Sequence, residues 1–211
     1  IDEVRSGLGF LGLDRIARIK RQLEGVTQKA MERELWSGDV RIAESEDNKA
    51  LIGSTASVLN SGTALSPKRA LALLEHTIAT TSHGGEQGII HATRDVVALL
   101  SSNSNMIFHE TGRDHLQTMG GTPVIAGSGY TGQGPASVSD GSQTASATNK
   151  WMYATGTVKV YLGDVDVVND NLSQAYDVAG NQNDMRIKAI RPAAVYFDTS
   201  IHLAVRVDLT A

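Results

Sequence analysis

The chain has 211 residues, a formal net charge of −4 and 41% hydrophobic residues, which suits one large domain or two small ones with a buried core. The balanced charge excludes disorder over most of the chain, and no apolar run approaches the ~18 residues of a membrane-spanning helix. The absence of cysteine excludes disulfides, thiolate metal sites and a cysteine nucleophile. The excess of acidic over basic residues, 23 against 19, argues against a surface specialised for binding nucleic acid.

The N-terminal segment is interpreted as the remnant of an arm, because glycines recur through residues 1–13. The chain begins at Ile1 without a signal-peptide pattern, so we expect either processing or further chain before it. Asp14 is predicted to cap a long helix that ends near Trp36, with Gly38 as its stop.

An apolar seam is predicted along this helix, because apolar residues recur every three or four positions. The seam comprises Ile16, Ile19, Leu23, Val26, Ala30, Met31 and Leu35. The remaining residues are largely charged, and residues 14–21 carry four cations and one anion. A solvated face is the favoured interpretation of these charges, with a face toward another subunit or a nucleic acid as the alternative.

The middle of the chain alternates helical and strand patterns. Residues 39–65 are predicted as a loop with short elements, and a helix is predicted to start at Ser66-Pro67. Its buried face comprises Ala70, Leu71, Leu74 and Ile78, and Gly84-Gly85 ends it. A strand over 88–92, a short helix after Thr93, and strands at 106–108 and 122–126 are then predicted.

The last part of the chain is predicted to be mostly β. Residues 127–150 are rich in Gly, Ser, Ala and Thr, and are predicted as a flexible loop or a hairpin tip that orders against a partner. Strands follow at 158–162, around Ile187 and over 201–209, the last half-buried, with Ile201 and Leu203 inward and His202 outward. Helices first and strands last favour an α+β fold.

Two motifs suggest ligand sites, and both fail in context. Gly127, Gly129 and Gly132 match the dinucleotide pattern G-x-G-x-x-G, but Pro135 and a Ser-rich tract follow where a helix must begin. An acidic cluster suggests a calcium-binding loop. Val168 and Asn169 stand where that loop needs an oxygen ligand and a glycine, so a strand followed by a polar turn is predicted. The cluster comprises Asp164, Asp166, Asn169, Asp170 and Asn171.

The six histidines show no metal-type spacing: they are His76, His83, His91, His109, His115 and His202. His91 lies in an apolar strand and is predicted to be a hydrogen-bonded core residue. No G-x-S-x-G elbow supports a Ser-His-Asp triad. The sequence therefore assigns no catalytic, cofactor-binding or metal-binding residue, and predicts that the chain is not an enzyme.

Six segments resemble major capsid proteins of tailed phages that infect actinobacteria, and the similarity extends in order over most of the chain from about residue 14. They are MERELWSGDV (31–40), SPKRALALLEHTIA (66–79), GGEQGIIHAT (84–93), TMGGTPVIAGSGYTG (118–132), WMYATGTVKVYLGDV (151–165) and AAVYFDTSIHLAVRVDL (193–209). The resemblance implies a Hong Kong 97-like fold. Residues 14–65 would form part of a peripheral domain with a spine helix, residues 66–184 mainly an axial domain, and residues 185–211 strands that lead back.

The same resemblance implies a structural subunit that self-assembles, as pentamers and hexamers, into an icosahedral head shell of a virion. The shell would enclose double-stranded DNA without sequence-specific binding and meet scaffold, decoration or portal proteins, after synthesis in the cytoplasm of the host bacterium. Neither a cofactor nor a membrane is implied. The alternatives are an encapsulin-like shell, another virion component such as a tail-tube or head-decoration protein, and a hydrolase built on His91 or His115.

Overall fold

The computed structural model describes residues 2–38, 50–53, 55–81, 87–104, 107–109, 116–127, 130–138, 141–169 and 187–210. The chain divides into two compact units, one of residues 1–31 and 160–194 and the other of residues 32–159 and 195–211. Helices and strands are both well represented, so the α+β expectation is confirmed at that level. Among the described residues, no helix is both long and apolar enough to cross a bilayer.

The first helix, α1 (Asp2–Ser37), begins earlier than the sequence predicts. The predicted start at Asp14 is wrong, because residues 2–13 are helical despite their glycines. Each glycine costs about 1 kcal/mol in a helix, but elongation of an existing helix adds one backbone hydrogen bond per residue. The predicted end is confirmed: Gly38 has φ +65°, and its N–H donates to the Glu34 carbonyl at 2.8 Å.

A seven-stranded sheet forms the centre of the larger unit, in the order β1-β11-β6-β2-β5-β4-β3. The pairs β1–β11 and β2–β5 are parallel, and the other pairs are antiparallel. The strand β4 is one that the sequence did not predict. The strands are β1 (Ser57–Val58), β2 (Ile89–Thr93), β3 (Ile107–His109), β4 (Leu116–Thr118), β5 (Pro123–Gly127), β6 (Asn149–Thr155) and β11 (His202–Asp208), and a 3-10 turn, η1 (Leu59–Gly62), follows β1.

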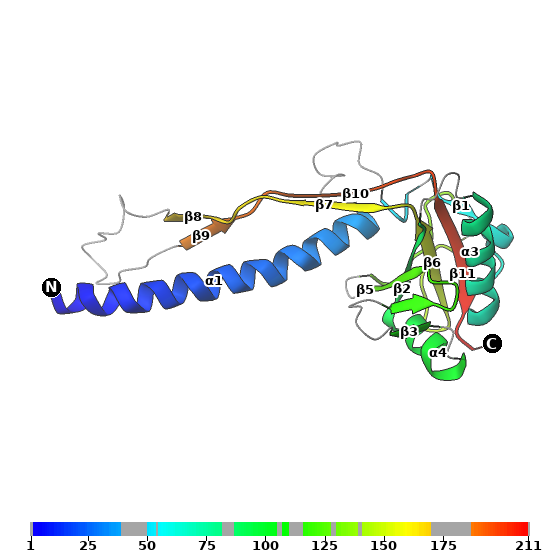
Figure 1. The fold of residues 1–211 in the computed structure, drawn as a ribbon, viewed down its shortest axis with the longest axis horizontal. Helices are drawn as coiled ribbons and strands as arrows, with labels where there is room; N and C mark the ends of the chain where they lie inside the picture. Colours follow the sequence, from blue (N-terminus) through cyan, green and yellow to red (C-terminus); the bar gives the residue numbers. More distant parts are fainter. Residues whose placement is uncertain are drawn as a thin grey trace. The chain divides into compact units, whose positions relative to one another are not determined.

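Two helices pack on one face of this sheet (Figure 1). They are α3 (Pro67–Thr81) and α4 (Arg94–Ser104), and α4 starts directly after Thr93, as predicted. The predicted buried face of α3 is confirmed, since all four of its apolar residues are buried. They pack in one cluster with alternate residues of the strands, including Met152 of β6 and Val205 of β11.

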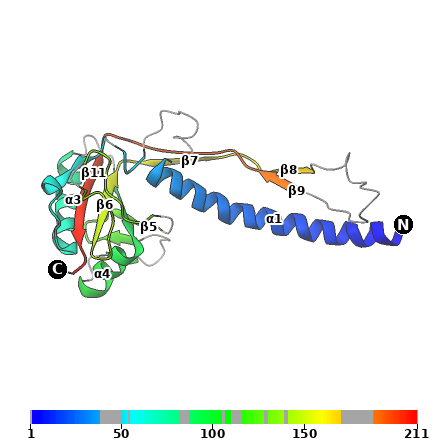
Figure 2. The same cartoon turned by 180° about the vertical axis from the view of Figure 1, so that it is seen from behind.

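The opposite face of the sheet is also covered, which corrects the prediction of a half-buried last strand. Residues 202–205 of β11 are all buried, because both faces of the strand have a cover. On this second face Trp151, Tyr153 and Ala204 pack against segments that are distant in sequence. The covering residues are Leu35 and Trp36 of α1, Leu51, Ala56, Tyr130, Val138, Val195 and Phe197. Figure 2 gives the reverse view of these strands.

The smaller unit consists of most of α1 and of strands in two-stranded ladders. β8 (Asp166–Asn169) pairs with β9 (Ile187–Ile190), and β7 (Val158–Leu162) pairs with β10 (Ala193–Phe197); of this second pair, residues 160–162 and 193–194 belong to the smaller unit. The predicted seam of α1 is only partly observed. Val26 is 61% exposed, Ala30 is exposed, and Thr27 is buried instead. The side chains of Ile16 and Ile19 lie outside the described residues.

Candidate functional site

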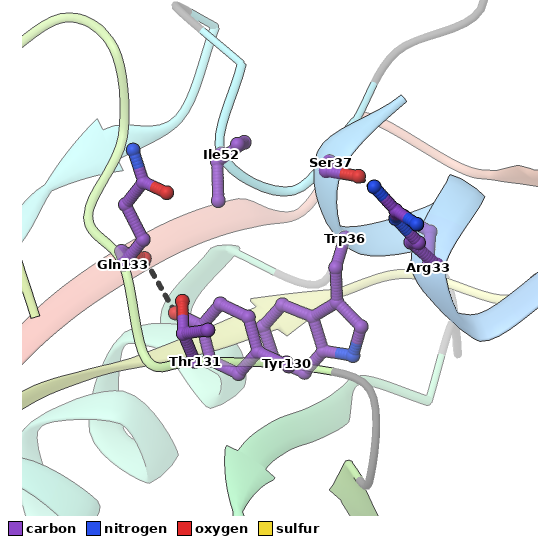
Figure 3. A pocket seen from close by; sticks show the side chains of 7 residues that line it. All are labelled: Arg33, Trp36, Ser37, Ile52, Tyr130, Thr131 and Gln133. Carbon is purple, nitrogen blue, oxygen red and sulfur yellow. Dashed lines mark hydrogen bonds between the residues drawn. The ribbon is translucent and has the colours of Figure 1, made fainter. Parts of the chain in front are cut away.

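The end of α1 lines a small cavity in the larger unit (Figure 3). Its volume is about 180 Å³, and its lining comprises Arg33, Trp36, Ser37, Ile52, Tyr130, Thr131 and Gln133. The Trp36 indole stacks on the Tyr130 ring, with centroids 3.5 Å apart and planes 8° from parallel. Ligand pockets for cofactors usually measure ~300–1,000 Å³, so this cavity suits a single side chain better than a nucleotide.

The two tyrosine hydroxyls beside the cavity are bound by backbone carbonyls. Tyr130 donates to the Gln133 carbonyl and lies 3.3 Å from the Trp151 carbonyl, and Tyr153 donates to the Gln133 carbonyl at 2.9 Å. Burial raises the pKa of both phenols above the usual value. Both hydroxyls therefore stay protonated at neutral pH and act as hydrogen-bond donors.

The glycine- and serine-rich loop before β6 packs within its own unit. The Trp151 N–H donates to the Gly132 carbonyl and its indole N–H to the Ser142 carbonyl, both at 2.9 Å. Gly134 packs so closely that a Cβ there would lie 2.5 Å from the Trp151 indole. The expectation was a flexible loop that orders against a partner; in its described residues this loop instead covers the second face of the sheet.

The same loop contains the G-x-G-x-x-G pattern, of which Gly129 lies outside the described residues. β5 ends at Gly127, and residues 130–138 contain no helix. The helix N-terminus that would bind a pyrophosphate does not follow these glycines in the described residues.

His91 is a core histidine, as the sequence predicts. It is fully buried, and its Nε2 lies 2.9 Å from the Thr155 hydroxyl oxygen. Because the Thr155 hydroxyl donates to the Gly156 carbonyl, its oxygen accepts the hydrogen bond and Nε2 carries the proton. The buried Nδ1 has no hydrogen-bond partner among the residues that the structure describes. Burial, with nearby His202 as a lesser cause, lowers the pKa of His91 to about 3.

His202 corrects a sequence prediction, because it does not face solvent. It is 4% exposed, and its Nε2 donates to the Leu51 carbonyl at 3.0 Å while its Nδ1 lies 3.0 Å from the Thr55 hydroxyl. Leu51 and Thr55 thus bind the two ring nitrogens. Among the other histidines, His76 is exposed, and the side chains of His83, His109 and His115 lie outside the described residues.

An apolar surface in the smaller unit is a second candidate site. We call Val160, Tyr161, Leu162 and Ile190 the exposed strand surface; they are 49%, 59%, 46% and 45% exposed. The strand predicted over 158–162 is confirmed as β7, and its residues 159–162 are all exposed. Three consecutive residues of a strand point to both sides of it, so both faces of this end of β7 are exposed.

The acidic segment next to this surface gives no metal site in the described residues. Asp164 and Asp166 are exposed, and β8 is a strand, as predicted. Asp170 and Asn171 lie outside the described residues. Among those that are described, no group of three or more His, Asp or Glu side chains converges as metal ligands would.

One polar cluster was not predicted from the sequence. Both carboxylate oxygens of Glu75 in α3 accept hydrogen bonds from threonines of the β4–β5 turn, Thr118 and Thr122, the latter at 3.0 Å. The Thr122 N–H in turn donates to the Thr118 hydroxyl at 3.1 Å. A cavity of about 210 Å³ adjoins this cluster. The partners lie far from Glu75 in sequence, so no local pattern signals the cluster.

Comparison of the chain with protein-family models, with curated proteins and with solved structures finds no match.

Proposed function

We propose that the chain is a structural subunit that assembles with copies of itself into an icosahedral head shell around double-stranded DNA. The resemblance to major capsid proteins of tailed phages supports this function and a Hong Kong 97-like fold with α1 as the spine helix. The exposed strand surface is the observation that carries the proposal.

The physical argument concerns how the smaller unit stabilises itself. Isolated two-stranded ladders are marginal in water, and this unit has only two-stranded ladders and one helix among its described residues. It also exposes Val26 and the four residues of the exposed strand surface. Full burial of one such side chain stabilises by roughly 1.5–3 kcal/mol. Contact with further copies of the chain would supply that burial.

In a shell, contacts of modest free energy are enough to hold the subunits together, because every subunit repeats the same contacts in a closed symmetric array. Exposed apolar patches mark protein interfaces, and Val160 and Leu162, two residues apart in β7, point to the same side of the strand. An encapsulin-like shell or another virion component would use the same surface, and no observation favours either. The hydrolase alternative has no support at His91, which is fully buried and lines neither of the two cavities.

Sedimentation velocity of the full chain tests the proposal, with Tyr161→Glu as the variant and Ala72→Glu as its control. Ala72 is exposed on α3, so both variants place a new carboxylate at an exposed position. We expect large particles for the unmodified chain and for Ala72→Glu, and single folded subunits for Tyr161→Glu. A chain that stays monomeric at every concentration, or a Tyr161→Glu variant that assembles normally, would contradict the proposal.

A further inference from the structure

Between residues 17 and 31, one side of α1 carries a continuous exposed strip without an acidic residue; on the same side, Asp14 precedes this strip and Glu32 follows it. At about 100° per residue, six side-chain positions between residues 17 and 31 fall within an arc of about 120°. All six are exposed: they are Arg18, Arg21, Gln22, Gly25, Gln28 and Lys29, which we call the basic stripe. It contains three cations, two amides and one glycine. None of the three cations has an ion-pair partner among the described residues.

The opposite side of the helix is the covered one. Thr27 is buried, and Leu23 and Met31, which flank it on the helical projection, are half-buried. The basic stripe therefore points away from the buried side of α1. Among the residues whose side chains are described, no acidic group pairs with its cations.

Gly25 lies at the centre of the basic stripe and has no packing role there. A Cβ added at this position would meet nothing within 4 Å. Glycine in a helix interior costs about 1 kcal/mol relative to alanine, so the position gives up stability with no steric need inside the chain. The missing side chain leaves a flat site between the cations, where an extended partner can approach the helix backbone closely.

We propose that the basic stripe binds the phosphate backbone of duplex DNA without reading its sequence; this rests on the proposed function, in which the shell encloses DNA. A protein partner fits the stripe less well, because the cores of protein interfaces are apolar and the stripe has no apolar side chain. Phosphate contacts need only cations and hydrogen-bond donors in a row, which Arg18, Arg21 and Lys29 and the two glutamines supply.

The expected strength of binding follows from the number of cations. From Arg18 to Lys29 the helix rises about 16 Å, so each cation can reach a different phosphate. Three phosphate contacts predict that log K falls with log salt concentration with a slope of about −2.7. The net charge of −4 keeps the contact weak and local, which suits a wall that holds DNA without fixing it.

Fluorescence anisotropy of a labelled 30-base-pair duplex with the full chain, over a range of salt concentrations, tests the inference. The variant is Arg18→Gln/Arg21→Gln/Lys29→Gln, and the control is Lys68→Gln/Arg69→Gln/Arg94→Gln, which removes three exposed cations of the other unit. We expect the first to lose about tenfold in affinity at low salt and most of the salt slope, and the control to change little. Equal losses in both, or no duplex binding by the unmodified chain, would overturn it.

A second variant tests whether the missing side chain at Gly25, apart from the charges, contributes to duplex binding. Gly25→Leu keeps every cation and favours the helix, so we expect weaker duplex binding with stability unchanged or raised. Unchanged duplex binding in this variant would overturn the role given to Gly25.

Electron microscopy of the same samples separates this inference from the proposed function. Shells that form without any dependence of duplex binding on the stripe would refute the inference and leave the function standing. Duplex binding that depends on the basic stripe, by a chain that never assembles, would refute the proposed function and leave the DNA contact standing. A triple variant that binds duplex normally but fails to assemble would assign the stripe to a contact between subunits and overturn the inference.

Discussion

The Trp36 indole lies flat on the Tyr130 ring, with centroids 3.5 Å apart, and so joins the last turn of α1 to the loop after β5. The same indole meets His91 and Tyr153 edge-on, at 5.7 and 5.6 Å. Aromatic pairs of this kind contribute about 0.5–1.5 kcal/mol beyond the burial of their area. Trp36 therefore connects the helix, the loop and the sheet in the larger unit.

Trp36→Ala should lower the free energy of unfolding by about 3–5 kcal/mol, because it leaves a large buried cavity. Tyr130→Phe should cost about 1 kcal/mol, since it keeps the ring and removes only the hydroxyl that binds the Gln133 carbonyl. Urea denaturation measures both, with Ala72→Glu, at an exposed position of α3, as control. A Trp36→Ala variant as stable as the unmodified chain would contradict the role given to Trp36.

Acid should destabilise the larger unit through His91. Its pKa is about 3 in the folded chain and 6.5 ordinarily, so between these values the unfolded chain binds more protons. The free energy of unfolding should therefore fall as the pH falls from about 6.5 toward 3, by up to ~1.4 kcal/mol per pH unit. The variant His91→Gln should flatten this dependence, and exposed His76→Gln should not. Equal pH profiles for all three proteins would refute the account of His91.

Two glycines should respond to alanine in opposite directions. Gly25→Ala should stabilise by up to about 1 kcal/mol, because the added Cβ meets nothing and alanine favours the helix. Gly134→Ala should destabilise by about 1–3 kcal/mol, because its Cβ would lie 2.5 Å from the Trp151 indole and 2.9 Å from the Gln143 backbone. Thermal unfolding distinguishes them, and a stabilising Gly134→Ala would show that the loop does not pack on Trp151.

Glu75→Gln should loosen the turn between β4 and β5. The amide presents a donor where Thr118 or Thr122 now donates to a carboxylate oxygen, at a cost of about 1–3 kcal/mol. Faster hydrogen exchange at the Gly121 and Thr122 amides would report it. Glu24→Gln, at an exposed position of α1, is the control. It should change neither the stability nor the hydrogen exchange of the Gly121 and Thr122 amides.

Local patterns predicted the elements that local rules control. The start of α3 at Pro67, its buried residues and the stop of α1 at Gly38 depend on nearby sequence, and all are observed. The burial of His202 could not be predicted, because it depends on segment 50–56, far away in the chain. The three-residue β4 was missed because it is too short to show a period, and the Glu75 cluster because its threonines are distant in sequence.

The exposed strand surface is the clearest case in which sequence and structure differ. The alternation of Val158, Val160 and Leu162 is typical of a strand with one buried face, yet Val160, Tyr161 and Leu162 are all exposed. A pattern typical of burial, in a strand that the described residues leave exposed, supports a cover supplied by another copy of the chain. On that view the alternation of apolar residues in β7 reflects burial in the assembled shell rather than in the single subunit.

Negative-stain electron microscopy of the purified full chain, over a series of protein concentrations, tests the central claim most directly. The account predicts closed shells, or rings with five- and six-fold symmetry, that are lost in Tyr161→Glu. A chain that remains a single subunit throughout the series would contradict it.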